Sequence, residues 1–131
     1  MIFLDSDIIT YYFQANKRIK ERLDSAILDD ELICTTVINA YEVLKGLRWK
    51  DPKNMQSQVV YFLNNIIIQY IDNEVVNLAA NIYADLRKKG ISIGDSDILI
   101  AAIVIANKGT LVTNNTKHFE NIEQLKVVNW V

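Results

Sequence analysis

The stretch IFLDSDIIT at residues 2–10 decides the fold, because an apolar run stops there at an aspartate and a helical pattern follows. Residues 1–4 have the character of a short buried strand, and Asp5 and Asp7 come directly after it. If that strand belongs to a parallel sheet, Asp5 lies at the carboxyl edge, where such sheets bind their ligands, and Asn115 falls on the same edge. Asp7 is already in or next to the first turn of the following helix, where an acid suits the helix dipole. The simpler interpretation of Asp5 is a helix N-cap, which is worth about 1 kcal/mol.

Apolar runs alternate with helical segments along the rest of the chain. Further strands are expected at residues 31–35, 66–71, 110–113 and 126–129. Helices are expected at residues 7–30, 37–49, 54–65, 74–89 and 97–107. This alternation predicts an α/β protein with three layers, α/β/α, around a parallel sheet of about five strands. The length of 131 residues fits a single domain over residues 1–131.

Three local signals add detail to this prediction. The β-branched run IIIQYI at residues 66–71 is typical of a parallel strand buried on both faces. Pro52 is expected to end one helix or to start the next, because it lacks an amide hydrogen and fixes φ. The single thiol, Cys34, is expected to be a small buried apolar residue.

The charge balance limits the possible classes of function. Lys and Arg number 14 against 16 acidic residues, which gives a net charge of −2. A protein that grips long nucleic acid electrostatically is normally more basic, so any nucleic-acid contact should be local or supported by metal ions. The basic clusters at residues 17–22, 45–50 and 87–89 are more simply solvated helix faces. We see no signal peptide, and the longest apolar run is too short for a membrane span, so we expect a cytoplasmic protein.

Glu42 lies in the middle of a predicted helix, within INAYEVLKGL at residues 38–47. A solvated face, or a pair with Lys45 one turn away, is the simpler interpretation. Asn39 and Gly46 share the helix face of Glu42, however, and that face is not uniformly charged. Gly46 could also let another backbone approach closely. Glu42 is therefore a candidate for a functional site.

Asp95 and Asp97 flank Ser96 in ISIGDSDILIAAIVIA, just before an apolar helix. We expect one of the two to cap that helix, because Gly94 ends the preceding loop and the first amides need an acceptor. Two carboxylates exceed what capping needs. Asp97, which is nearer the apolar run, is the better candidate for a metal ligand.

The run TLVTNN at residues 110–115 is another apolar segment that ends in small polar residues. Asn115 is a weaker metal ligand than a carboxylate, but its amide can hold a water or a phosphate oxygen, and Thr113 could do likewise. Ordinary turn residues are the alternative interpretation of both.

The candidate ligands are oxygen donors. Without a Cys/His cluster, such a set selects hard cations, so Mg²⁺ or Mn²⁺ is implied and zinc is not. His118 is the only histidine, so a Ser-His-Asp triad would have to be built on it. Two or three carboxylates around Mg²⁺ suit phosphodiester hydrolysis.

Several motifs together resemble a known family. They are the LDSD start, Glu42 in EVLKG, the DILIAA run after Asp97, TNN followed by HF, and the closing Trp130. In this order and spacing they resemble the PIN-domain ribonucleases, and more narrowly the VapC-type toxins of type II toxin–antitoxin pairs. The resemblance covers essentially the whole chain.

The resemblance implies roles for particular residues and partners. Asp5, Glu42 and Asp97 would bind Mg²⁺ or Mn²⁺, and an RNA would be the substrate. A fourth position, which is often acidic in the family, falls on Asn115, and Asp95 could compensate for the missing charge. The family also implies a homodimer and an antitoxin whose tail enters the acidic groove.

Three alternatives stay open from the sequence. A haloacid-dehalogenase-like phosphatase would use Asp5 as nucleophile and Asp7 as acid/base, with residues 94–97 on the metal and Lys88 or Lys89 on the phosphate. That scheme gives no role to Glu42.

A receiver-like signalling module would be phosphorylated on Asp72, at the end of the run at residues 66–71. A degenerate PIN domain would keep the fold and only bind a partner, and Asn115 is the feature that favours it. Three intact acids weigh against a loss of activity.

Overall fold

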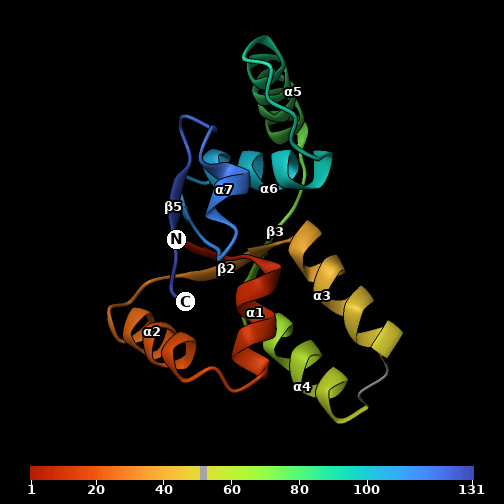
Figure 1. Ribbon diagram of the computed structural model, residues 1–131. Helices are drawn as coiled ribbons and strands as arrows, with labels where there is room; N and C mark the ends of the chain where they lie inside the picture. The colour runs from red at the N-terminus through yellow and green to blue at the C-terminus, as the bar shows by residue number, and fades with distance from the viewer. Residues whose placement is uncertain (51–52) are drawn as a thin grey trace.

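The computed structural model describes residues 1–50 and 53–131, so the expected break at Pro52 lies outside the described residues (Figure 1). Five parallel strands form one sheet in the order β3-β2-β1-β4-β5. They are β1 (Ile2–Leu4), β2 (Ile33–Thr36), β3 (Ile67–Gln69), β4 (Thr110–Val112) and β5 (Lys126–Val128). The central strand β1 pairs with β2 on one side and β4 on the other, so the residues after these three strands meet at one edge.

Helices cover both faces of the sheet. They are α1 (Ser6–Phe13), α2 (Lys17–Leu28), α3 (Val37–Lys50), α4 (Lys53–Asn64), α5 (Asn73–Lys88), α6 (Asp95–Ala106) and the short α7 (Thr116–Phe119). In Figure 1, α5, α6 and α7 lie on one side of the sheet, and α1, α2 and α4 lie on the other. The predicted α/β/α fold with a five-stranded parallel sheet is therefore confirmed.

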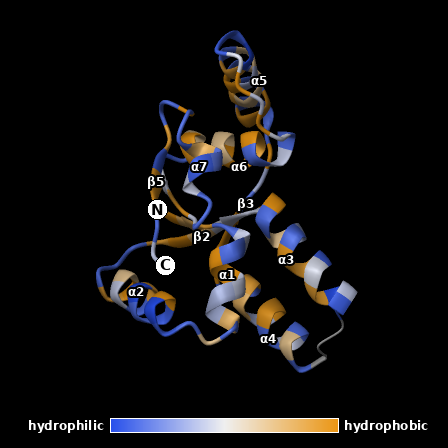
Figure 2. Cartoon of the chain, viewed as in Figure 1, coloured by the Kyte–Doolittle hydropathy of each residue, from blue (hydrophilic) through white to orange (hydrophobic). Residues whose placement is uncertain are grey.

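Each face of the sheet has its own apolar core. Helix α6 is apolar after its first turn (Figure 2), and its residues Ile100 to Val104 are almost completely buried against α5 and the sheet. The opposite core joins apolar side chains of α1, α2, α3 and α4, with Ile9 and Val59 completely buried. Cys34 is buried in the first core, as expected for a small apolar residue.

Two strand and helix expectations were wrong in detail. The segment at residues 7–30 is two helices, because Ala15 adopts a positive φ of 60° and Asn16 caps α2. The run at residues 66–71 supplies only the three-residue strand β3, which lies at the edge of the sheet. Its residue Ile67 is 37% exposed, so this strand is not buried on both faces.

No helix among the described residues is both long enough and apolar enough to cross a bilayer.

Candidate active site

Asp5 stands at the centre of the candidate site, at the carboxyl end of β1. It caps α1, because its Oδ1 accepts a hydrogen bond from the backbone amide of Ser6 at 2.9 Å. It is also more than a cap: Oδ1 accepts from Asn39 Nδ2 at 2.7 Å, and Oδ2 accepts from Thr113 Oγ1 at 2.6 Å. The side chain is nearly buried, with 6% exposed. Donors from three separate elements therefore fix the direction of this carboxylate.

The sheet explains why these donors meet. Leu4 is paired with Val112, so the residues that follow them, Asp5 and Thr113, are neighbours across β1 and β4. On the other side, Thr36 ends β2 and its Oγ1 donates to Asn39 Oδ1 at 2.7 Å. That bond leaves the Nδ2 group of the amide to donate to Asp5.

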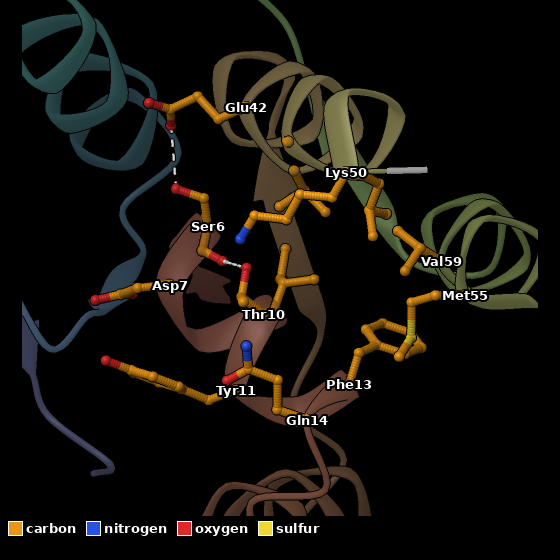
Figure 3. A pocket seen from close by; sticks show the side chains of 14 residues that line it. Ser6, Asp7, Thr10, Tyr11, Phe13, Gln14, Glu42, Lys50, Met55 and Val59 are labelled. Carbon is orange, nitrogen blue, oxygen red and sulfur yellow. Dashed lines mark hydrogen bonds between the residues drawn. The ribbon is translucent and has the colours of Figure 1, made fainter. Parts of the chain in front are cut away.

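Glu42 lies one turn beyond Asn39 on α3 and faces the same group. Its Oε1 accepts a hydrogen bond from Ser6 Oγ at 3.1 Å (Figure 3). Burial raises the pKa of Glu42, the charges of Asp5 and Asp97 raise it further, and the bond from Ser6 opposes the shift. Lys45 lies over the Tyr41 ring, 5.1 Å from its centroid, and its charge lowers the pKa of Glu42. The bond from Ser6 and the influence of Asp5 and Asp97 place the side chain of Glu42 in the acidic group.

Asp97 approaches from the first turn of α6. Its Oδ2 lies 3.1 Å from His118 Nδ1. Burial is the largest cause of its raised pKa, and the charge of Asp5 adds to it, while His118 acts in the opposite direction. The three acids predicted as metal ligands are therefore close enough to influence one another electrostatically.

The prediction that Asp95 or Asp97 caps α6 was wrong. Gly94 is the N-cap and makes no side-chain bond, and both aspartates lie in the first turn. Asp95 is exposed, and two residues along a helix turn its side chain about 200° away from Asp97. No hydrogen bond or ion pair joins Asp95 to the acids around Asp5 within the described part of the chain, so the structure does not bring it into this group.

Asn115 lies at the rim of the site. Its backbone amide donates to Thr113 Oγ1 at 3.0 Å, the same hydroxyl that donates to Asp5. It occupies the N-cap position of α7, but its side chain makes no capping bond and the residue is exposed. The side chain is therefore available at the entrance beside Asp5.

Asp7 takes a larger part than the sequence indicated. Its Oδ2 accepts from the backbone amide of Asn114 at 3.0 Å, whereas Oδ1 is buried and has no hydrogen-bond partner in the described residues. Burial, followed by the charge of Asp5, raises the pKa of Asp7 to about 6. An acid with an unpaired buried oxygen beside another acid marks an excess of negative charge here.

Sequence reasoning missed the supporting residues Ser6 and His118 and gave no role to Asn39. A signal existed for two of them. Ser6 separates the two aspartates of the DSD motif, and Asn39 precedes Glu42 by three residues, which places both side chains on one helix face. Nothing in the sequence around His118 indicated contact with Asp97, because the two lie on different helices.

A hard divalent cation fits this arrangement. The donors are carboxylate oxygens, and the pKa values of Glu42 and Asp97 are raised first by burial and then by neighbouring acids, so a bound cation would favour their charged forms. Within residues 1–50 and 53–131, no three acidic, imidazole or thiol side chains are already drawn together as a metal cluster. Asp5, Glu42 and Asp97 are the residues that would close around the ion.

Two of the alternative hypotheses are weakened by the contacts of Lys89 and Asp72. Lys89, a candidate phosphate ligand of the phosphatase scheme, bonds to Asp85 at 3.1 Å and to Glu123 at 2.9 Å. Asp72, the candidate phosphorylation site, caps α5 by accepting from the amide of Val75 at 2.9 Å. Both residues have structural partners outside the acidic group.

Comparisons with known proteins identify the family of the chain. The PIN domain family model matches residues 2–125. Ribonuclease VapC1 of Methanocaldococcus jannaschii is 32% identical over 124 residues, which cover 94% of this chain and 82% of that protein. Ribonuclease VapC2 of Rickettsia felis is 31% identical over 134 residues, which cover 97% of this chain and 96% of that protein.

Solved structures give the same result. A chain in the crystal structure of VapBC2 from Rickettsia felis, bound to a DNA fragment from their promoter, matches with a TM-score of 0.90 and 29% identity over 100% of both chains. A chain in the structure of FitAB bound to IR36 DNA matches with a TM-score of 0.81 and 26% identity, covering 100% of this chain and 96% of that one. The chain therefore belongs to the PIN-domain family, among its VapC-type members.

Proposed function

We propose that this protein is a Mg²⁺- or Mn²⁺-dependent endoribonuclease that hydrolyses RNA phosphodiester bonds in the cytoplasm, as the toxin of a VapBC-type toxin–antitoxin pair. The observation that carries the proposal is the convergence of Asp5, Glu42 and Asp97 at the carboxyl edge of the sheet. Relatives named ribonuclease VapC support the choice of RNA as substrate.

The residues of the chain have distinct tasks in this proposal. Asp5, Glu42 and Asp97 hold the cation, which when bound would neutralise phosphate charge and lower the pKa of water. Asn39 and Thr113 fix the direction of the Asp5 carboxylate by hydrogen bonds of 2.7 and 2.6 Å. This preorganisation limits the reorganisation needed when substrate arrives.

Three further side chains complete the site. Ser6 orients Glu42 through a 3.1 Å hydrogen bond, and His118 restrains Asp97 from α7. Asn115 positions a water or a phosphate oxygen at the rim, where an acid is absent. An RNA phosphate would otherwise be repelled by the carboxylates, which is why a cation is required.

We also infer a homodimer and an antitoxin partner. Large apolar side chains are exposed on α3 and α5: Trp49 is 88% exposed, Tyr41 63% and Tyr83 48%. Exposed apolar residues that form a contiguous patch mark interaction surfaces, and these residues are candidates for such a patch. Light scattering on the purified chain tests the dimer, and a monomer at every concentration would contradict it. The VapBC complexes among the matching structures support a protein partner.

The nuclease proposal is tested by incubating the purified protein with structured and single-stranded RNA in Mn²⁺, Mg²⁺ or EDTA. Asp97→Asn is assayed alongside. Cleavage that requires the metal and is lost in Asp97→Asn supports the assignment. Absence of cleavage of any RNA by the wild-type protein would favour the degenerate, partner-binding alternative, and Asn115→Asp would then test whether the missing fourth acid is the cause.

A further inference from the structure

A cavity of about 550 Å³ opens between α1, α3 and α4, directly beside the candidate active site (Figure 3). Ser6, Asp7 and Glu42 belong both to its lining and to the acidic group around Asp5. Its volume lies within the range of about 300–1,000 Å³ that is usual for small-ligand sites. Any chain whose phosphate reached the acids would therefore have this cavity next to it.

The lining combines an apolar floor with a polar rim. Leu47, Met55 and Val59 supply apolar surface from α3 and α4. Phe13 adds an aromatic ring from α1, and Thr10 and Gln14 add hydrogen-bonding groups from the same helix. This is the combination that receives an unpaired nucleobase, which needs a flat apolar contact for its faces and polar groups for its edge.

Gly46 keeps the cavity open. It lies inside α3, where a glycine costs about 1 kcal/mol relative to alanine. Its backbone needs no positive φ, and a Cβ atom placed there would meet nothing within 4 Å, so neither conformation nor packing requires glycine. The expected close approach of another backbone is not present in the described chain. The absence of a side chain at Gly46 widens the cavity, which this residue lines.

Lys50 supplies a positive charge to the same cavity. Its side chain extends across the opening toward Ser6 and Thr10 (Figure 3). It is the only Lys or Arg among the described residues that line the cavity. A cation placed at this point attracts a phosphate.

We propose that this cavity seats one unpaired nucleotide adjacent to the scissile phosphate, with its base over the apolar floor and its phosphate at Lys50. The inference rests on the proposed ribonuclease function and adds a binding site for the nucleotide next to the scissile phosphate. Base stacking and a phosphate contact are sequence-tolerant, so they position the strand without demanding a long recognition sequence.

The test fills the cavity from Gly46. We compare kcat and KM for a single-stranded RNA in Mn²⁺ between the wild-type protein, Gly46→Leu and Gly46→Ala. Gly46→Leu is expected to lower kcat/KM by about 10-fold or more, because its side chain occupies the space of the base. Gly46→Ala adds only a Cβ and is expected to stay within about 2-fold of wild type. An unchanged Mn²⁺ affinity, and a thermal stability that is not lower than that of wild type, show that the acids and the fold are intact.

The charge is tested separately. Lys50→Gln should lower kcat/KM several-fold and weaken its dependence on salt concentration, because a phosphate contact is lost. Lys88→Gln, which removes the same charge from the end of α5, should leave both unchanged. If Gly46→Leu and Lys50→Gln both cleave RNA within 2-fold of wild type, the inference is overturned. A cavity that received a peptide of a protein partner would give that result.

A measurement without turnover separates this inference from the proposed function. RNA that carries 4-thiouridine is irradiated with the wild-type protein, and the attachment site is found by mass spectrometry. Attachment at Phe13, Tyr11 or Met55, lost in Gly46→Leu, supports the nucleotide site even if no RNA is cleaved. Attachment confined to residues outside the cavity contradicts it, whether or not the protein is a nuclease.

Discussion

Asp5 combines two roles that the sequence presented as alternatives. Its carboxylate caps α1 through the amide of Ser6, and it also receives hydrogen bonds from Asn39 and Thr113 on neighbouring elements. A cap alone would need neither of the last two donors. The capping bond and the side-chain donors act together, because each restricts rotation of the Asp5 carboxylate, which must point out of the sheet toward a ligand.

Glu42→Gln is expected to abolish cleavage without unfolding the protein. The amide oxygen can still accept from Ser6, but a negative charge that the cation requires is lost, so activity should fall by on the order of 100-fold or more. Stability in EDTA should be unchanged or slightly higher, because the pKa of Glu42 is raised by burial and by neighbouring acids. RNA cleavage and urea unfolding measure the two effects.

The control for Glu42→Gln is Glu74→Gln, which removes an acid from the first turn of α5. It should retain wild-type cleavage. If Glu42→Gln cut RNA at the wild-type rate, Glu42 would not belong to the catalytic group and the proposed metal site would need different ligands.

Asp7 makes the stability of the metal-free protein depend on pH. Its pKa is about 6 in the folded protein against an ordinary value of 3.8, so between those values the folded state binds more protons than the unfolded state. Stability from this group is therefore present at low pH and is lost as pH rises through about 6. Glu42 and Asp97, whose pKa values are also raised, change stability in the same direction.

Asp7→Asn should remove part of that decline. We expect the free energy of unfolding in EDTA to rise by roughly 1 kcal/mol near pH 7, after allowance for solvent screening of a partly exposed group. Near pH 4 it should change little. Urea unfolding across this pH range measures it. An equal gain at both ends of the range would show that packing, and not charge, is responsible.

The residues of the site could be predicted unequally. Asp5, Glu42 and Asp97 were identifiable because each acid stands where an apolar segment or helix face makes a charge unexpected. The contribution of Asp7 to the site could not be predicted, because its shifted pKa depends on burial and on the distance to Asp5. The role of Asp95 was also not predictable, since the two acids that flank Ser96 in the motif point in directions about 200° apart around the helix.

At the scale of elements, the strand–helix alternation predicted every strand and five helical segments among the described residues. Four of these segments are single helices, and the first is divided into α1 and α2. That division depends on one backbone conformation at Ala15, which side-chain periodicity cannot detect. The four-residue α7 is too short to produce a periodic pattern. The sequence also did not reveal that β3 is a short edge strand, because hydrophobicity alone does not say whether a strand has neighbours on both sides.

Ala15→Gly tests the cause of the break between α1 and α2. Ala15 has a φ of 60°, a conformation that costs a residue with a Cβ about 1 kcal/mol and that glycine adopts freely. We expect the substitution to raise the free energy of unfolding by roughly 0.5–1 kcal/mol. Ala84→Gly, in the middle of α5, should lower it by about 1 kcal/mol. If both substitutions destabilise equally, strain at Ala15 is not significant.

At the scale of the whole molecule, the site joins the two halves of the fold. Asp5 follows the central strand, Glu42 comes from α3, and Asp97 comes from α6, which packs in the core on the opposite face from α1. The acids thus repel one another across the boundary between the two packed layers. Apolar side chains buried in the two cores fix the elements that carry the acids. The packing of these side chains offsets the electrostatic cost of bringing the acids together.

A divalent cation should therefore stabilise the entire domain and not only a loop. Bound to the folded state alone at 100 times its Kd, it would add about 2.7 kcal/mol, which for a domain of this size raises Tm by roughly 10 °C. We expect Mn²⁺ to raise the Tm of wild-type protein relative to EDTA, and Asp97→Asn to lose most of that increase, because it removes the ligand contributed by α6. Asp95→Asn removes an equal charge from the same turn, and because its side chain faces away from the group it should keep the full increase. If both variants lost the Mn²⁺-induced increase in Tm equally, the ion would respond only to the total charge at the start of α6. The proposal that Asp5, Glu42 and Asp97 bind one ion between the two layers would then be wrong.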